Sequence, residues 1–261
     1  MSSGGEPQRV LHFVSGGFSG ATQVAVDLAR AAIHADAGTR TLLVLRRKRA
    51  TDGARVQALR DEGLAVEVVP GALRAATLWA LVRLCRRWRP DVLVAHGFPE
   101  HLIGRWAGWL AGRLGDGGPR LVQVEHNSRE RYGPWTRWQA RWLARRSAAL
   151  VGVSEGVRRS LLALGAPPAL TRAIPNGIDL ARFATDDRPW STRDKDIVMS
   201  ARFARQKDHA TLLRALALLR ERHGLAPRLT LAGAGSARYR GEAERLCAEL
   251  ELGAQVDFAG H

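Results

Sequence analysis

Two cations near the end of the chain have the spacing of an anion site. Arg202 and Lys207 follow an expected strand over residues 196–199 and precede an expected helix over 210–222. Guanidinium and ammonium groups bind phosphate oxygens, and the free N–H groups of a helix N-terminus favour the same negative charge. A second glycine-rich turn around Gly233 follows the next expected strand, 229–232. The pattern predicts a diphosphate site, and ordinary solvated charge is the alternative for each cation.

A glycine-rich loop lies near the start of the chain. Gly16 and Gly17 follow an expected strand over residues 10–15 and precede an expected helix over 21–34. Glycine lets the backbone approach a ligand closely, so the loop is a phosphate candidate, with a plain turn as the alternative. The spacing is not G-x-G-x-x-G, and basic rather than acidic residues follow the second strand. Both features speak against NAD.

Two histidines stand at expected strand ends. His96 follows the strand 92–95, and His126 follows the strand 121–125. Ligands of open α/β sheets lie beyond the carboxyl ends of the strands, so both positions suit a site. We predict a site role for His126 and retain His96 as an acceptor-side candidate, although a structural hydrogen bond is its favoured role. Asn176 belongs to a Pro-Asn-Gly turn, which by itself indicates only a turn.

The elements that position these residues alternate along the chain. Apolar residues at i, i+3 and i+4 spacing mark amphipathic helices, and short β-branched runs mark strands. The expected further strands are 41–45, 66–69, 149–152 and 255–258, and the expected further helices are 54–62, 73–88, 101–114, 135–146, 155–164 and 239–250. Such alternation predicts parallel sheets with helices on both faces. A polar, aperiodic segment suggests a linker at 181–195 between domains at 1–180 and 196–261.

Composition limits the cell compartment and the partners. The 261 residues carry a formal net charge of +15, and a surface this basic attracts polyanions. No apolar run is long enough for a membrane span and no signal peptide is visible, so we expect a cytoplasmic protein. Cys85 and Cys247 are expected to be free thiols, and no metal-ligand spacing is present, so no metal is expected.

Arginine and tryptophan alternate in the segment 135–146. Tryptophan suits the headgroup level of a membrane and arginine suits lipid phosphate, so we expect this segment to contact an anionic membrane or a lipid-linked acceptor. The alternative is an amphipathic helix with core tryptophans. Nucleic acid is not expected, because no nucleic-acid-binding motif accompanies the charge. The residues concerned are Trp135, Trp138, Arg141, Trp142 and Arg145.

The order of these motifs resembles the family 4 glycosyltransferases, which have the GT-B fold. The resemblance covers essentially the whole chain and rests on eight weak motifs in register: Gly16-Gly17, Pro90-Asp91-Val92 with His96, Glu125-His126, Val151–Ser154, Pro175–Asp179, Arg202 with Lys207, Leu231–Gly235 and Val256–Gly260. It implies two Rossmann-like doubly wound domains and a retaining sugar transfer without a cofactor.

The resemblance also implies roles for single residues. Arg202 and Lys207 would hold the donor diphosphate and stabilise the leaving group, and His126 would line the transferred sugar. The remaining donor-side residues would be Gly16, Gly17, Asn176, Gly233 and Gly260, the last of which would meet the base together with His261. The donor would be a nucleotide sugar of UDP or GDP type. The acceptor would be a lipid-linked or polysaccharide glycan, as in lipopolysaccharide biosynthesis, at the inner face of the plasma membrane.

The sequence departs from the family at two places. Ala201 stands where the family commonly has glycine, and nothing supplies the Glu-x(7)-Glu motif that follows Val-x-Phe-x-Gly. We therefore expect an incomplete second domain. This leaves a rival function open, a truncated, catalytically inactive nucleotide-binding remnant or a subunit that needs a second chain. A nucleotide-sugar epimerase of similar fold is disfavoured by the Arg-x(4)-Lys and Pro-Asn-Gly patterns.

Overall fold

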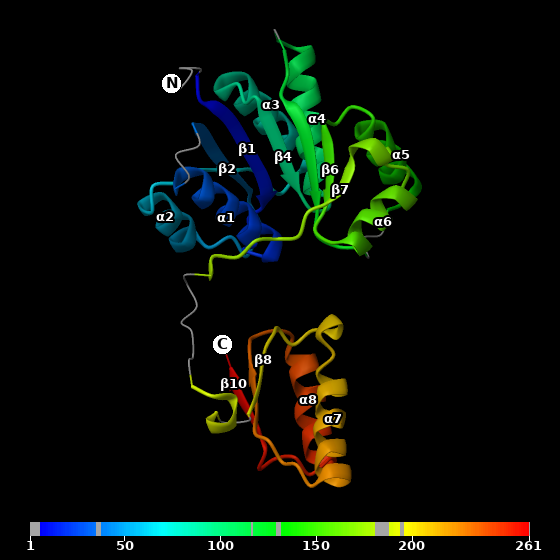
Figure 1. The fold of residues 1–261 in the computed structure, drawn as a ribbon. Coiled ribbons are helices and arrows are strands. Elements are labelled where there is room, and N and C mark those ends of the chain that lie inside the picture. Colours follow the sequence, from blue (N-terminus) through cyan, green and yellow to red (C-terminus); the bar gives the residue numbers. More distant parts are fainter. Residues whose placement is uncertain are drawn as a thin grey trace. The chain divides into compact units, whose positions relative to one another are not determined.

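The computed structural model describes residues 6–34, 38–115, 117–128, 132–180, 188–193 and 196–260. The chain forms two compact units, Met1–Leu180 and Ala181–His261, which are described separately (Figure 1). Most of the expected linker and His261 lie outside the described residues. The predicted α/β fold with parallel sheets is confirmed in both units.

The first unit is built on a seven-stranded parallel sheet with the strand order β3-β2-β1-β4-β5-β6-β7. The strands are β1 Gln8–Ser15, β2 Thr39–Arg46, β3 Ala65–Val69, β4 Val92–His96, β5 Arg120–Glu125, β6 Ala149–Gly152 and β7 Thr171–Ala173. The chain moves outward from β1 to β3 and then returns to place β4 on the other side of β1. The carboxyl ends of β1 and β4 are therefore the point where the strand order reverses, which is where ligands bind in such sheets.

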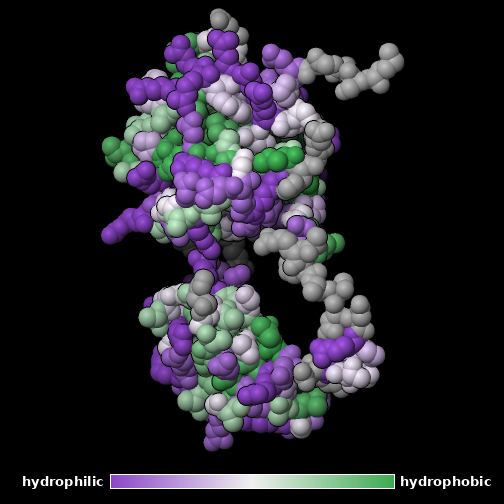
Figure 2. All heavy atoms as spheres, turned by 90° about the vertical axis from the view of Figure 1, so that its left-hand side faces the viewer, coloured by the Kyte–Doolittle hydropathy of each residue, from purple (hydrophilic) through white to green (hydrophobic). Residues whose placement is uncertain are grey.

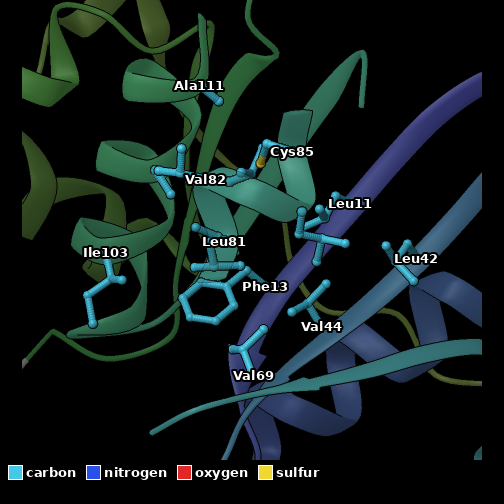
Figure 3. Close-up of a cluster of buried hydrophobic side chains, with 14 of the residues drawn as sticks. Leu11, Phe13, Leu42, Val44, Val69, Leu81, Val82, Cys85, Ile103 and Ala111 are labelled. Carbon is cyan, nitrogen blue, oxygen red and sulfur yellow. The ribbon is translucent and has the colours of Figure 1, made fainter. Parts of the chain in front are cut away.

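Helices cover both faces of this sheet (Figure 1). Residues of α1 and the neighbouring strands form one buried cluster, and residues of α3 and α4 form another on the opposite face, shown in Figure 3 around Phe13 and Leu81. This two-sided burial explains why the central strands are almost continuously apolar. The helices are α1 Gly20–His34, α2 Gly53–Asp61, α3 Arg74–Trp88, α4 Glu100–Arg113, α5 Pro134–Ala144 and α6 Glu155–Ala163.

The second unit has a three-stranded parallel sheet with the order β10-β9-β8. Its helices share one buried cluster with Leu229 and Leu231 of β9, so both pack on the same face. Val198 points to the other face and is 68% exposed. Within the described part, this unit is therefore covered on one face rather than two. The elements are β8 Ile197–Ser200, α7 His209–His223, β9 Leu229–Ala232, α8 Ala237–Glu249 and β10 Val256–Gly260.

The expected elements recur with boundaries shifted by no more than two residues. Strand β7 was not predicted from the sequence, because three residues are too few to show a period.

The surface agrees with the composition, since the face drawn in Figure 2 carries many hydrophilic side chains on each unit. Among the described residues, no helix combines the length and the apolar character needed to cross a bilayer.

Candidate functional site

The two predicted cations of the second unit lie just beyond the carboxyl end of β8. Both Arg202 and Lys207 are exposed, and neither makes an ion pair or a side-chain hydrogen bond with another described residue. The backbone between them is held by a hydrogen bond from the Lys207 N–H to the Ala204 carbonyl, 2.9 Å long. One short loop thus carries two exposed positive charges that no described residue neutralises, which suits an anionic ligand.

The glycine-rich turn after β9 lies against the same loop. A β-carbon on Gly233 would fall on the carbonyl of Ala201, and one on Gly235 would stand 2.5 Å from the backbone N and O of Phe203. Only glycine lets these two backbones meet, so the glycines position the turn beside the Arg202 loop. Gly260 ends β10 next to this turn and accepts a hydrogen bond from the Gly233 N–H.

The two helix N-termini of the second unit differ. Asp208 caps α7, and its carboxylate accepts hydrogen bonds from the backbone N–H and the side-chain hydroxyl of Thr211. The expectation of an open helix N-terminus directly after Lys207 is therefore wrong, because an acidic side chain already occupies it. By contrast, α8 begins at Ser236 without a side-chain cap. The helix N-terminus with N–H groups available to a ligand is therefore that of α8, after the glycine turn, and not that of α7.

In the first unit, Gly16 and Gly17 form the loop beyond β1, at the reversal of strand order. A β-carbon on Gly16 would stand 2.7 Å from the Arg46 carbonyl, and the Gly16 N–H donates a 2.8 Å hydrogen bond to that carbonyl. The expectation that the Gly16 backbone N–H binds a phosphate is therefore wrong, because this N–H already donates to the Arg46 carbonyl. Gly17 is exposed, and its N–H makes only a long contact of 3.4 Å with the Ser15 hydroxyl.

Beside this loop a buried acid is neutralised by two bases. Glu100, at the start of α4, lies 3.1 Å from Arg46 Nη1 and 3.2 Å from Lys48 Nζ. Arg46 is itself buried and donates from Nη2 to the Gly71 carbonyl. In the sequence, only the basic run after the second strand is noticeable. Nothing there indicates that Glu100, 54 residues from Arg46, forms an ion pair with it.

Three histidines form a row: His12 lies in β1, His96 ends β4 and His126 directly follows β5. His12 Nδ1 lies 3.1 Å from His96 Nε2, and His96 Nδ1 lies 3.4 Å from His126 Nε2. Burial lowers the pKa of both His12 and His126 to about 4, and burial with two neighbouring imidazoles lowers the pKa of His96 well below its usual range. All three rings are therefore neutral at pH 7.

The outcomes for the two predicted histidines differ. His96 is 1% exposed, so its assignment to the acceptor side is wrong, and the structural hydrogen bond favoured for it is what the structure shows. His126 is partly exposed at the edge where β1, β4 and β5 end. His12 was missed, because a single histidine inside an apolar strand carries no sequence signal.

A second buried polar network lies on the α4 side of the same edge. Arg105 is fully buried and donates from Nη2 to His101 Nδ1 at 2.8 Å and from Nη1 to the Ser147 hydroxyl at 3.2 Å. His101 Nε2 lies 2.7 Å from the Tyr132 hydroxyl, which lies 3.3 Å from Glu125. Because arginine only donates, His101 must accept at Nδ1 and carry its proton on Nε2. The network thus fixes the strand end that precedes His126.

The arginine–tryptophan segment is α5. Trp135 and Trp138 stack at 4.8 Å and are 68% and 48% exposed, as expected for a contact surface. Trp142 differs, because it stacks on Trp106 at 4.6 Å and lies half-buried under the Arg146 guanidinium. The alternative of a core tryptophan is correct there. Arg141 and Arg145 are both exposed, and Arg141 donates from Nε to the Leu164 carbonyl.

An apolar groove of about 280 Å³ opens beside Trp135. It lies between the N-terminal halves of α3, α4 and α5 and is lined by Arg74, Ala75, Leu78, Pro99, Leu102, Ile103, Trp106, Trp135, Thr136 and Gln139. In parallel α/β units each helix starts where the preceding strand ends, so this groove lies towards the same edge as His126.

Asn176 stands apart from these features, exposed in the segment after β7. Among the described residues, no three metal-ligating side chains cluster.

Two protein-family models match the chain in sequence. The model described as Glycosyltransferase Family 4 matches residues 18–182, and the model described as Glycosyl transferases group 1 matches residues 183–261. The chain belongs to this family of glycosyltransferases. The predicted enzyme class, a nucleotide-sugar-dependent glycosyltransferase, is confirmed. A search of curated proteins gives no match.

Solved structures share the fold of this glycosyltransferase. Anabaena Alr3699/HepE in complex with UDP superposes with a TM-score of 0.75 at 20% identity, over 97% of this chain and 69% of that one. The lipopolysaccharide outer core galactosyltransferase WaaB gives 0.66 at 13% identity, over 97% and 68%. A putative UDP-N-acetylglucosamine 2-epimerase from Listeria monocytogenes gives 0.60 at 13% identity, over 97% and 69%. The glycosyltransferase is shorter than these chains, and their likeness confirms the predicted GT-B fold.

Proposed function

We propose that this glycosyltransferase transfers a sugar, with retention of its anomeric configuration, from a UDP- or GDP-type nucleotide sugar to a lipid-linked or polysaccharide acceptor in lipopolysaccharide or surface-glycan synthesis. The observation that carries the proposal is the pair of exposed cations, Arg202 and Lys207, which have no partner among the described residues and lie beside a turn that only glycine can form. Complexes of Anabaena Alr3699/HepE with UDP and UDP-glucose support the UDP type of donor.

The cations act on the leaving group. When the bond between the sugar and the phosphate breaks, negative charge develops on the nucleoside diphosphate. Arg202 and Lys207 offset that charge, which stabilises the transition state more than the ground state. Gly233, Gly260 and the open N-terminus of α8 lie at the same edge of the second sheet and complete the donor side.

The first unit contributes the sugar and acceptor side. His126 offers a neutral imidazole at the sheet edge and hydrogen-bonds the transferred sugar. Gly17, rather than Gly16, supplies the loop amide that remains available there. Asn176 is retained as a donor-side contact on the strength of the family resemblance.

The acceptor part of the proposal rests on the α5 surface. An apolar groove next to two exposed tryptophans suits a lipid chain, and exposed arginines such as Arg145 suit the phosphates of an anionic membrane. We therefore place the enzyme at the inner face of the plasma membrane as a peripheral protein. The name of WaaB, a lipopolysaccharide galactosyltransferase of the same fold, agrees with such an acceptor.

The function is tested by incubating the chain with UDP-glucose, UDP-galactose, UDP-N-acetylglucosamine and GDP-mannose, with and without a lipid-linked glycan extract. We expect nucleoside diphosphate release with one donor, an increase when acceptor is added, and a product whose anomeric proton signal in NMR matches retention. Lys207→Ala should abolish most of the release, whereas Arg214→Ala, which removes an exposed charge on α7, should not. No release with any donor would refute the transfer function and favour the inactive remnant.

The membrane contact is tested by flotation with vesicles. We expect the native chain to float with vesicles containing phosphatidylglycerol and to remain below with pure phosphatidylcholine. The double variant Trp135→Ala/Trp138→Ala should float several-fold less, because each buried indole contributes on the order of 1 kcal/mol or more. Trp79→Ala removes another half-exposed tryptophan outside the groove and serves as the control. Equal flotation of all proteins would argue against the α5 surface.

A further inference from the structure

The three-histidine row follows from the register of the sheet. His12 lies opposite Val94, two residues before His96, and His96 lies opposite Val124, two residues before His126. Each step to the next strand thus advances by two residues, which keeps all three imidazoles on one face of the sheet. The row leads from the interior, where His12 is 6% exposed, to the partly exposed ring of His126.

The hydrogen bonds of the row couple the three rings. A neutral imidazole carries one proton, so one nitrogen donates and the other accepts. If His12 donates from Nδ1, then His96 accepts at Nε2 and donates from Nδ1, and His126 accepts at Nε2 and carries its proton on Nδ1. If the direction is reversed, every proton moves to the other nitrogen and His126 Nδ1 becomes an acceptor. The row has these two ordered states and no net charge in either.

The outer nitrogen, His126 Nδ1, makes no hydrogen bond with another described residue, so it is the atom that the row offers to a ligand. We propose that His12 and His96 are positioning residues that hold the orientation of His126 and couple its tautomer to their own, so that its Nδ1 meets a sugar hydroxyl as the outer end of a hydrogen-bonded row. This inference rests on the proposed role of His126 at the sugar. His12 acts without touching the sugar, through two intervening hydrogen bonds.

The neighbouring network shows how differently a histidine can be fixed. His101 receives a hydrogen bond from Arg105, which can only donate, so its tautomer has no alternative. The row lacks an obligate donor of this kind among its three rings. The tautomers of the three rings are therefore coupled, and removing His12 or His96 changes the hydrogen-bonded row that determines the balance between the two tautomers of His126.

The direct test is the tautomer of His126, read from the ¹⁵N shifts of its two ring nitrogens in protein labelled at histidine and assigned with His126→Gln. We expect the balance between the two tautomers of His126 to differ between the native protein and His12→Leu, although residue 12 lies two hydrogen bonds away from the ring that is observed. His12→Asn keeps a polar group at the position of Nδ1 and should restore much of the native pattern. Leu11→Val, which alters the opposite face of the same strand, should leave the pattern unchanged.

The same variants are then compared in sugar transfer. We expect His12→Leu to lower kcat by about 10- to 100-fold, by analogy with the loss seen when a residue that orients a metal-binding histidine is removed. KM for the donor should change little, and Leu11→Val should keep the native kcat. An unchanged His126 spectrum in His12→Leu, or an altered spectrum with an unchanged kcat, would overturn the proposal. The spectrum is read without turnover, so an inactive native chain would count against the proposed function and not against the coupling.

Discussion

The polar groups at the sheet edges of the two units differ in burial and in bonding. In the first unit the polar side chains are buried and matched to one another, as in the histidine row, the Arg105 network and the Glu100 ion pairs. In the second unit Arg202 and Lys207 are exposed and have no partner among the described residues. Buried polar groups must be satisfied internally, whereas exposed cations remain available to a ligand. Under the proposed function, the first edge orients a neutral sugar and the second binds a charged group.

The largest effect is expected from breaking the buried network. Arg105→Met removes the donors to His101 Nδ1 and to the Ser147 hydroxyl, and each unsatisfied buried group costs about 1–3 kcal/mol. We expect the free energy of unfolding of the first unit to fall by roughly 3 kcal/mol. Tryptophan fluorescence in a urea titration reports this unit, because seven of the eight tryptophans belong to it.

Arg113→Met provides the control on the same helix. Arg113 is exposed in the last turn of α4, so its loss should change the stability by less than about 0.5 kcal/mol. If both variants unfold at the native urea concentration, the first edge is not held together by its buried polar groups, and the contrast between the units fails.

An intermediate effect is expected from pH. His12 has a pKa of about 4 in the folded protein and about 6.5 in the unfolded chain, so the unfolded state binds more protons between these values. Stability is then complete above pH 6.5 and is lost as the pH falls towards 4. Each such histidine contributes a slope of up to about 1.4 kcal/mol per pH unit.

The variant His12→Leu removes one titrating group and should flatten that slope between pH 6.5 and 4. Stability is measured by urea titration at several pH values. Leu11→Val should lower stability by a constant amount at every pH, because no titrating group is lost. A native slope in His12→Leu would mean that His12 is not held neutral in the folded protein.

The sequence predicted the repeating elements well, because they depend on local periodicity and on turns. The Arg202–Lys207 loop could be predicted too, since all of its parts lie close together in the chain. The histidine row could not, because His12 and His96 are 84 residues apart and meet only through strand order and register. The occupied amide of Gly16 and the Asp208 cap were also missed, since sequence shows which groups exist and not which are already bonded.

The most direct test of the account is calorimetric titration of UDP and GDP into the native chain, Arg202→Ala, Lys207→Ala and Arg214→Ala. Removing a charged hydrogen-bond partner costs about 1.5–3 kcal/mol, so each of the first two variants should bind the preferred nucleotide at least about tenfold more weakly. Arg214→Ala should bind as the native chain does, and all variants should unfold within about 0.5 kcal/mol of it. Native affinity in both Arg202→Ala and Lys207→Ala would contradict the assignment of the second edge to the donor diphosphate.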